Sequence, residues 1–105
     1  MTDQTQKPIC PKMEQTFNLI GKRWTGLIIR TLMGGSRRFA DLESIIPHLS
    51  RRMLSERHKE LDRAGIVVRS VYSETPVRIE YTLSKKGIEL AHALDSVQQW
   101  AEKWI

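Results

Sequence analysis

Residues 50–83 constrain the fold more than any other part of the chain, because they predict a short helix followed at once by a β-hairpin. Ser50 is a favourable N-cap, and Gly65 can adopt the left-handed conformation that ends a helix. Residues 66–83 then contain two strand-like runs separated by the turn-prone sequence Ser-Glu-Thr-Pro. The second run alternates apolar and polar side chains, which is typical of a strand with one buried face.

The predicted helix has one apolar face and one mostly cationic face. When its residues are placed at 100° steps, His58 falls among the apolar residues, while Arg52 and Lys59 fall opposite. The first outward turn offers hydroxyl and guanidinium groups that suit phosphate oxygens and base edges in a DNA major groove. These groups belong to Ser50, Arg51, Arg52 and Ser55. A solvated charged face would explain the same residues, but the hairpin that follows favours a recognition helix with its wing.

A second short helix is predicted immediately before the recognition helix. The apolar-periodic run over residues 39–46 is stopped by Pro47. Only a three-residue turn separates the two helices, so they must meet at a sharp angle, as in a helix-turn-helix. We therefore predict a winged helix-turn-helix, with the helix pair within residues 34–65 and the wing over residues 66–83.

Candidate DNA contacts follow from this arrangement. Arg69 and Arg78 on the wing are placed to reach the DNA backbone or a minor groove. Arg37 and Arg38 precede the first helix of the pair, where a phosphate contact and a solvated turn explain them equally well. The predicted DNA-binding residues are Arg37, Arg38, Ser50, Arg51, Arg52, Ser55, Lys59, Arg69 and Arg78.

Two helices are predicted before this unit. Met13, Phe17 and Ile20 recur at helical spacing in a first helix that breaks near Gly21. A second helix covers about residues 24–33. It directs Leu27, Ile28 and Leu32 inward and ends at a pair of glycines. We interpret both apolar stripes as parts of the core.

Residues 84–105 predict one long helix with a surplus of apolar side chains. Its apolar positions repeat at spacings of four and three, as in a heptad seam. The chain's own first helix would cover part of this surface. We expect a second copy to cover the rest, in a two-fold dimer that sets two recognition helices roughly 34 Å apart, or a multiple of it. The predicted dimer-interface residues are Met13, Phe17, Leu90, Leu94, Val97, Ala101 and Trp104.

Length and charge bound the remaining possibilities. The 105 residues fit one α+β, mainly α, domain over residues 10–105, preceded by a flexible N-terminal arm over residues 1–9. A formal charge of +5 favours an anionic partner such as double-stranded DNA. No apolar run approaches the roughly 20 residues of a membrane span, and the start lacks the apolar stretch of a signal peptide. A single cysteine excludes an internal disulfide framework, so we expect a cytoplasmic protein.

Several short motifs are spread along the chain from residue 10 onward. They are Cys10-Pro11, Gly21-Lys22-Arg23-Trp24, Arg38-Phe39, Met53-Leu54-Ser55, Gly65, the segment from Pro76 to Tyr81, and Leu83-Ser84. In combination they resemble the HxlR family of bacterial transcription regulators. The resemblance implies a MarR-like homodimer that binds a palindromic operator, usually as a repressor and sometimes as an activator, and that dimerises through its first and last helices. His48-Leu49 stands where Gly-Ile is common in that family.

Cys10 is the residue that would make such a regulator a sensor. It lies just before the first helix, where unpaired backbone N–H groups and the nearby Lys7 and Lys12 favour a thiolate, the form that oxidants and electrophiles attack. The resemblance implies a redox-sensing Cys10, because in several family members the matching cysteine responds to quinones, aldehydes, hypochlorite or disulfide stress. Oxidation would pair it with Cys10 of a second subunit or with a small thiol, whereas alkylation needs neither. Simple packing as a small apolar residue is the alternative.

Two other classes of function compete with this interpretation. An enzyme would need Cys10 and one of the three histidines, yet their spacing matches no nucleophile, metal-site or phosphate-loop motif. We therefore expect no enzyme activity, no metal and no cofactor. A winged helix used for protein contacts stays open, and the salt dependence of DNA binding would separate it from an operator-binding protein.

Overall fold

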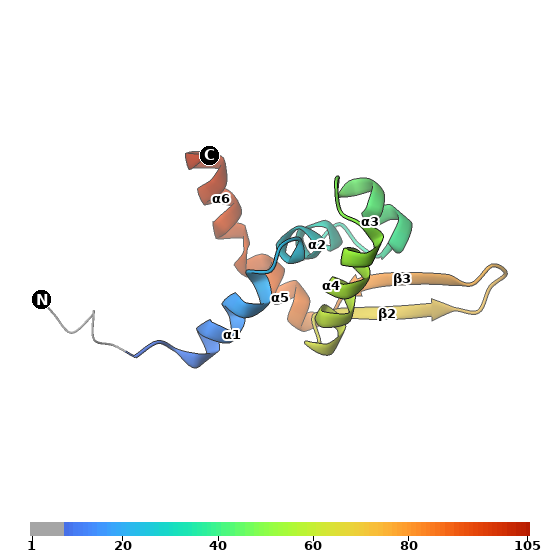
Figure 1. Ribbon diagram of the computed structural model, residues 1–105, viewed down its shortest axis with the longest axis horizontal. Helices are drawn as coiled ribbons and strands as arrows, with labels where there is room; N and C mark the ends of the chain where they lie inside the picture. The colour runs from blue at the N-terminus through green and yellow to red at the C-terminus, as the bar shows by residue number, and fades with distance from the viewer. Residues whose placement is uncertain (1–7) are drawn as a thin grey trace, which may run out of the picture.

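Residues 8–105 are described by the structure, a computed structural model (Figure 1). Six helices and a small antiparallel sheet make up this part of the chain. In order they are α1 (Pro11–Ile20), α2 (Thr25–Leu32), β1 (Arg37–Arg38), α3 (Phe39–Ile45), α4 (Arg51–Arg63), β2 (Val67–Tyr72), β3 (Arg78–Leu83), α5 (Lys85–Ala93) and α6 (Asp95–Trp104). The predicted α+β, winged helix-turn-helix fold is confirmed. The predicted flexible arm falls mainly on residues 1–7, which lie outside the described part.

The helix pair begins and ends where its capping residues predict. The Oγ of Ser50 accepts a hydrogen bond from the backbone N–H of Met53 at 3.1 Å and fixes the start of α4. Gly65 follows the helix in the left-handed conformation, with φ of 74°. In the turn between α3 and α4, His48 also takes a positive φ, of 68°, which glycine adopts more easily. The helix pair forms despite this strained position.

The core lies where α2, α3 and α4 meet the base of the sheet. Ile28, Leu42 and Leu54 are among its fully buried side chains, and each such residue contributes about 1.5–3 kcal/mol relative to an exposed one. One detail of the prediction is wrong, because Leu27 is 54% exposed and Ile29 faces inward instead. The buried face of α2 begins at Thr25 and continues at spacings of three and four, which leaves Leu27 outside it.

The wing is a hairpin that projects from the body (Figure 1). In its register Val67 lies opposite Leu83, and Tyr72 lies opposite Arg78. A continuous buried face on the second strand was predicted, but within residues 78–83 Leu83 alone is buried. The rest is only half-buried, because the outer part of the hairpin extends past the helices that cover its base.

The sheet has a third strand that sequence analysis misses. Strand β1 pairs with the free edge of β3, which gives the order β1-β3-β2. The Oγ of Ser36, just before β1, donates a hydrogen bond to the carboxylate of Glu80 at 2.8 Å and reinforces the pairing. Two residues are too few to show a strand pattern, so this strand exists only because β3 offers it an edge.

The start of α5 packs tightly onto the end of the recognition unit. Ser84 caps α5 as predicted, because its Oγ accepts a hydrogen bond from the N–H of Gly87 at 3.0 Å. A Cβ at Gly87 would lie 2.1 Å from the carbonyl oxygen of Ile66, a distance that no side chain tolerates. Glycine is therefore required for α5 to approach the base of the wing so closely.

The predicted single C-terminal helix is wrong, because the chain breaks at Leu94 into α5 and α6. In Figure 1 the two helices run in different directions. Arg30 of α2 holds the junction: its Nη1 donates to the carbonyl of Ala91 at 3.3 Å and lies 2.5 Å from the carboxylate of Asp95. Arg30 is far away in the sequence, so helical periodicity alone carries no signal for these contacts at the break.

The apolar stripe of the first helix is not part of the core of this chain. Within the described residues no member of α1 is buried, and Phe17 is 60% exposed. The interpretation of this stripe as core is therefore wrong for the single chain. The corresponding interpretation of the α2 stripe is correct for Ile28 and Leu32, which are buried. In residues 8–105 no helix is long and apolar enough to cross a membrane.

Candidate nucleic-acid interface

The outward face of α4 carries the central part of the predicted interface. The side chains of Arg51 and Arg52 are 79% and 89% exposed. Each lies near one carboxylate, with Arg51 Nε 3.3 Å from Glu43 and Arg52 Nε 3.7 Å from Glu56. Exposed ion pairs of this kind contribute only about 0–1 kcal/mol. Both guanidinium groups can therefore exchange these carboxylates for phosphate or base oxygens at little cost.

The opposite face of α4 anchors the helix to the body, as predicted. Arg57 Nε donates a hydrogen bond to the backbone carbonyl of Arg23 at 2.9 Å. Lys22 Nζ lies 2.9 Å from the carboxylate of Glu60, and its hydrogen bond holds the pKa of Glu60 below the usual value. These contacts tie α4 to the connection between α1 and α2, so the exposed face is held in a fixed orientation.

The two arginines of the wing differ in how they are held. Arg69 on β2 is exposed. Arg78 on β3 instead packs 4.3 Å above the ring of Tyr72, and its Nε lies 3.1 Å from Glu74. Arg69 is therefore available to a partner, whereas Arg78 must give up contacts within the hairpin to reach one.

The two arginines of β1 also differ. The guanidinium of Arg37 lies against Gly34, since a Cβ there would come within 2.7 Å of it. The Nε of Arg37 is buried without a partner in the described chain. Arg38 is exposed, while its backbone N–H donates to the carboxylate of Asp41 at 2.9 Å. Of the two, Arg38 is the more exposed.

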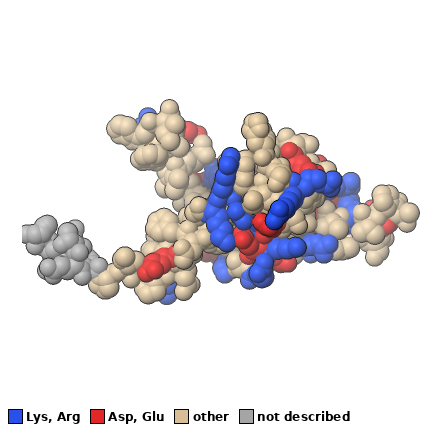
Figure 2. Space-filling model, viewed as in Figure 1, with Lys and Arg blue, Asp and Glu red and all other residues tan. Residues whose placement is uncertain are grey.

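Positive charge is concentrated on one region of the molecule. Figure 2 shows Lys and Arg side chains gathered over α4 and the adjoining wing, with Asp and Glu interspersed. In the same view α1 and α6 present mostly uncharged surface. The nine predicted DNA contacts lie on β1, α4, its N-cap and the wing.

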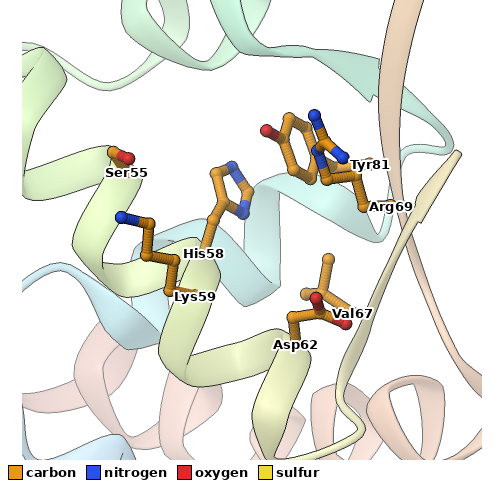
Figure 3. Close-up of a pocket in the computed structure, with 7 residues that line it drawn as sticks. All are labelled: Ser55, His58, Lys59, Asp62, Val67, Arg69 and Tyr81. Atoms are coloured by element: carbon orange, nitrogen blue, oxygen red, sulfur yellow. The ribbon is translucent and has the colours of Figure 1, made fainter. Parts of the chain in front are cut away.

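A cavity of about 350 Å³ separates α4 from the wing (Figure 3). Its lining consists of Ser55, His58, Lys59, Asp62, Val67, Arg69 and Tyr81. The imidazole of His58 stacks on the ring of Tyr81, with ring centroids 3.8 Å apart. Burial lowers the pKa of His58 to about 4, so this side chain is neutral at pH 7. The sequence pattern placed His58 on the packed face of α4. It contained no signal for the cavity, because the two walls of the cavity come from α4 and from the wing.

A second concave surface lies between α1, α2 and α6. This apolar groove, of about 450 Å³, is lined by Phe17, Ile20, Trp24, Gly26, Leu27, Arg30, Leu94, Val97, Gln98 and Ala101. Four of the seven predicted dimer residues border it, and two more, Met13 and Trp104, are exposed elsewhere on α1 and α6. Leu90 packs instead against the core of its own chain.

Cys10 lies at the amino end of α1 and is exposed. Its carbonyl accepts a hydrogen bond from the N–H of Glu14 at 3.1 Å, so the backbone is fixed to the first turn while the thiol faces solvent. Lys12 follows in the same turn, and Lys7 lies outside the described residues. Because α1 also contributes Phe17 to the apolar groove, the cysteine and the groove are joined by a single helix.

Comparison with known sequences gives consistent matches over nearly the whole chain. The family model described as HxlR-like helix-turn-helix matches residues 19–105. YvaP of Bacillus subtilis (strain 168), an uncharacterised HTH-type transcriptional regulator, is 48% identical over 100 residues, which cover 95% of this chain and 93% of YvaP.

Solved structures give the same picture. The reduced form of the transcriptional regulator YodB from B. subtilis has a TM-score of 0.83 at 48% identity, covering 92% of this chain and 95% of that one. YodB is also known in a quinone-bound form, with a TM-score of 0.79 at 45% identity over 91% and 100% of the two chains. The redox regulator HypR in its oxidised form has a TM-score of 0.83 at 34% identity, covering 90% and 96%. These relatives are named as regulators and not as enzymes.

Proposed function

The chain belongs to the HxlR-like helix-turn-helix family of transcription regulators, and on this premise we propose that it is a homodimeric repressor. It binds a palindromic DNA operator and releases it when Cys10 is oxidised or alkylated. One observation carries the proposal: the molecule separates a cationic helix-and-wing surface from an uncovered apolar groove formed by α1, α2 and α6.

In the proposed complex, α4 enters the major groove. Arg51, Arg52 and Ser55 face base edges, because they occupy the exposed first turns of the helix. The remaining predicted contacts bind the phosphate backbone and fix the register of the protein on the duplex. They are Arg37, Arg38, Ser50, Lys59, Arg69 and Arg78.

Dimerisation is supported by the exposure of apolar residues on α1 and α6. Phe17, Val97 and Trp104 are 60%, 58% and 66% exposed, and the first two border the groove. Contiguous exposed apolar surface of this kind marks an interaction site. A two-fold pairing of α1 and α6 buries these residues and presents two copies of α4 to successive faces of a palindrome.

Thiol sensing is supported by the exposed Cys10 and by relatives whose structures are described as quinone-bound or as oxidised redox regulators. The sequence has one cysteine, so oxidation forms a disulfide with Cys10 of the second subunit or with a small thiol, whereas a quinone alkylates the thiol directly. Either change displaces α1 at the dimer contact and alters the separation of the two recognition helices.

The DNA-binding part of the proposal is tested by fluorescence anisotropy on duplexes selected from genomic fragments. Binding should be sequence-selective and should weaken with salt, with a log-log slope of about −0.9 for each phosphate neutralised. Arg52→Gln should weaken selective binding by about 1–3 kcal/mol and relax preference at one operator position if Arg52 reads a base. Lys85→Gln removes the same charge from the exposed start of α5 and should leave binding unchanged.

A chain that binds no duplex selectively at any salt concentration would instead be a winged-helix module for protein contacts.

The sensing part of the proposal is tested with Cys10→Ser. The variant should bind the operator like the wild type, because Cys10 lies at the far end of α1 from the helix pair. Diamide or a benzoquinone should release the wild type and leave the variant bound. Mass spectrometry then distinguishes an intersubunit disulfide, a mixed disulfide and a quinone adduct. Release of Cys10→Ser by these reagents would contradict the sensor assignment while leaving the repressor assignment intact.

A further inference from the structure

The imidazole of His58 is buried without a hydrogen-bond partner. The residue is 4% exposed, and among residues 8–105 neither of its ring nitrogens is paired. A neutral imidazole carries one donor and one acceptor, and leaving such a buried group unmatched costs about 1–3 kcal/mol. A phenylalanine would stack on Tyr81 equally well without this cost. Stability of the fold therefore does not explain why an imidazole stands at this position.

The side chains around His58 form a donor-rich site with a small net positive charge. Lys59 and Arg69 supply two cations, and Asp62 supplies one carboxylate. Figure 3 shows Ser55 and Lys59 on one side of His58 and Arg69 on the other, beside the ring of Tyr81. The ammonium, guanidinium and imidazole N–H groups are all donors that bind phosphate oxygens. They come from both walls of the cavity, α4 and the wing.

We propose that this cavity binds a phosphate group, and that its occupant is one backbone phosphate of the DNA, held by α4 and the wing together. This inference rests on the proposed function. A phosphodiester carries a single negative charge, which the net charge of the lining balances. Inorganic phosphate shares this chemistry, but the cavity lies within the cationic region that carries the proposed DNA contacts, which favours the DNA backbone.

The proposal gives Lys59 and Arg69 a shared partner and gives His58 a role. Lys59 on α4 and Arg69 on β2 contact the same phosphate from opposite sides, so binding fixes the wing relative to the recognition helix. The ring nitrogens of His58 are buried in the free chain, so the imidazole turns toward the phosphate to donate its N–H when the site is filled. A matched pair of contacts from two elements is worth more than two independent ones, because it also orients the wing.

The first test replaces each backbone phosphate of a selected duplex, in turn, with a neutral methylphosphonate. The wild type should lose about tenfold or more in affinity at one position per half-site, as expected for charge-assisted hydrogen bonds. Lys59→Gln and Arg69→Gln should each lose much less at that same position, because their partner is already missing. Arg63→Gln, an α4 variant outside the cavity, should keep the full loss. Different sensitive positions for Lys59 and Arg69 would overturn the shared site.

The second test addresses His58 directly. His58→Phe should weaken binding to the unmodified duplex several-fold and reduce the loss at the sensitive phosphate, while its melting temperature stays equal or rises. His92→Phe makes the same substitution at an exposed histidine of α5, outside the cavity lining, and should bind like the wild type. Wild-type affinity for His58→Phe would overturn the role of the imidazole, and the unchanged fold of both variants is checked by circular dichroism.

A third measurement separates the two sources of phosphate. Inorganic phosphate is titrated into DNA-free protein while the ¹⁵N resonances of the His58 ring are followed. A saturable shift that Arg69→Gln abolishes, combined with the absence of any sensitive methylphosphonate position, would assign the cavity to free phosphate and overturn our assignment to DNA. Selective DNA binding without a sensitive position refutes this inference alone, whereas failure to bind any duplex refutes the proposed function.

Discussion

Burial, and not charge pairing, sets the titration of His58. Its pKa is lowered to about 4 in the folded chain, compared with 6.5 for an exposed histidine. Between these values the unfolded chain binds a proton that the folded chain does not. The free energy of unfolding therefore falls as the pH drops from 6.5 toward 4. The full loss is on the order of 3 kcal/mol.

Replacing His58 with phenylalanine should remove this pH dependence. Urea unfolding at pH 7, 6, 5 and 4.5 should show a falling free energy for the wild type and a nearly constant one for His58→Phe. Glu60 and Asp95 also have lowered pKa values, but their contribution is lost only below their usual values of 4.5 and 3.8, outside this range. Tyr81→Phe keeps the imidazole and should follow the wild type. Parallel curves for His58→Phe and the wild type would contradict the assignment.

Sequence periodicity predicted which face of a helix a residue occupies but not what the residue touches. The packed face of α4 was predicted correctly, since Leu54, His58 and Leu61 are all buried. The environment of Arg37 was not, because it depends on how the chain turns back over Gly34. The unpartnered imidazole of His58 was likewise outside reach, since it depends on a wing residue, Tyr81, that is distant in sequence.

At the level of helices and strands, features that depend on neighbouring residues were predicted correctly, whereas features that depend on residues distant in the sequence were not. Caps depend on a few neighbouring residues, so Ser50, Gly65 and Ser84 were predicted correctly. Strand β1 depends on the edge of β3, more than 40 residues later in the chain. The break at Leu94 depends on Arg30 in the same way. Neither the edge of β3 nor Arg30 can be recognised from the sequence pattern around β1 or Leu94.

The apolar groove allows the role of α6 in the proposed dimer to be tested. Val97→Asp places a charge in the groove and should convert the proposed dimer into a folded monomer, because Val97 is 58% exposed and contributes little to the core of its own chain. Sedimentation velocity measures the mass, and circular dichroism checks the fold. Ser96→Asp adds the same charge one residue earlier, outside the groove lining, and should stay dimeric. A dimeric Val97→Asp would show that α6 is not the contact.

For the whole molecule, the sequence predicted more apolar side chains on residues 84–105 than one chain can cover. In the structure, exposed apolar side chains lie on α6 and in the groove between α1, α2 and α6. The predicted seam assumed one straight helix, and the break at Leu94 divides it: Leu90 packs on the core, while Val97 and Trp104 lie on a separate arm. The geometry of a dimer could not be derived from the heptad pattern, because the pattern does not contain the angle between α5 and α6.

The proposed two-fold dimer would fix the distance between its recognition helices, which leads to a prediction about the proposed operator. Inserting about five base pairs between the half-sites rotates them by half a turn of the duplex. Affinity should fall close to the non-specific level, because one copy of α4 then faces away from its groove. Replacing the five central base pairs without changing the length should have a much smaller effect. Equal affinity for the lengthened operator would indicate that each chain binds DNA independently.

Arg30 connects the C-terminal arm to the body of the molecule. It belongs to α2, whose opposite face fills the core, and it holds both the carbonyl of Ala91 and the carboxylate of Asp95. Ala91 belongs to α5 and Asp95 to α6, so Arg30 contacts both helices on either side of the break. The base of the C-terminal arm is therefore fastened to α2, the helix that also fills the core, so the direction in which α6 leaves the body is set by a residue from the first third of the chain.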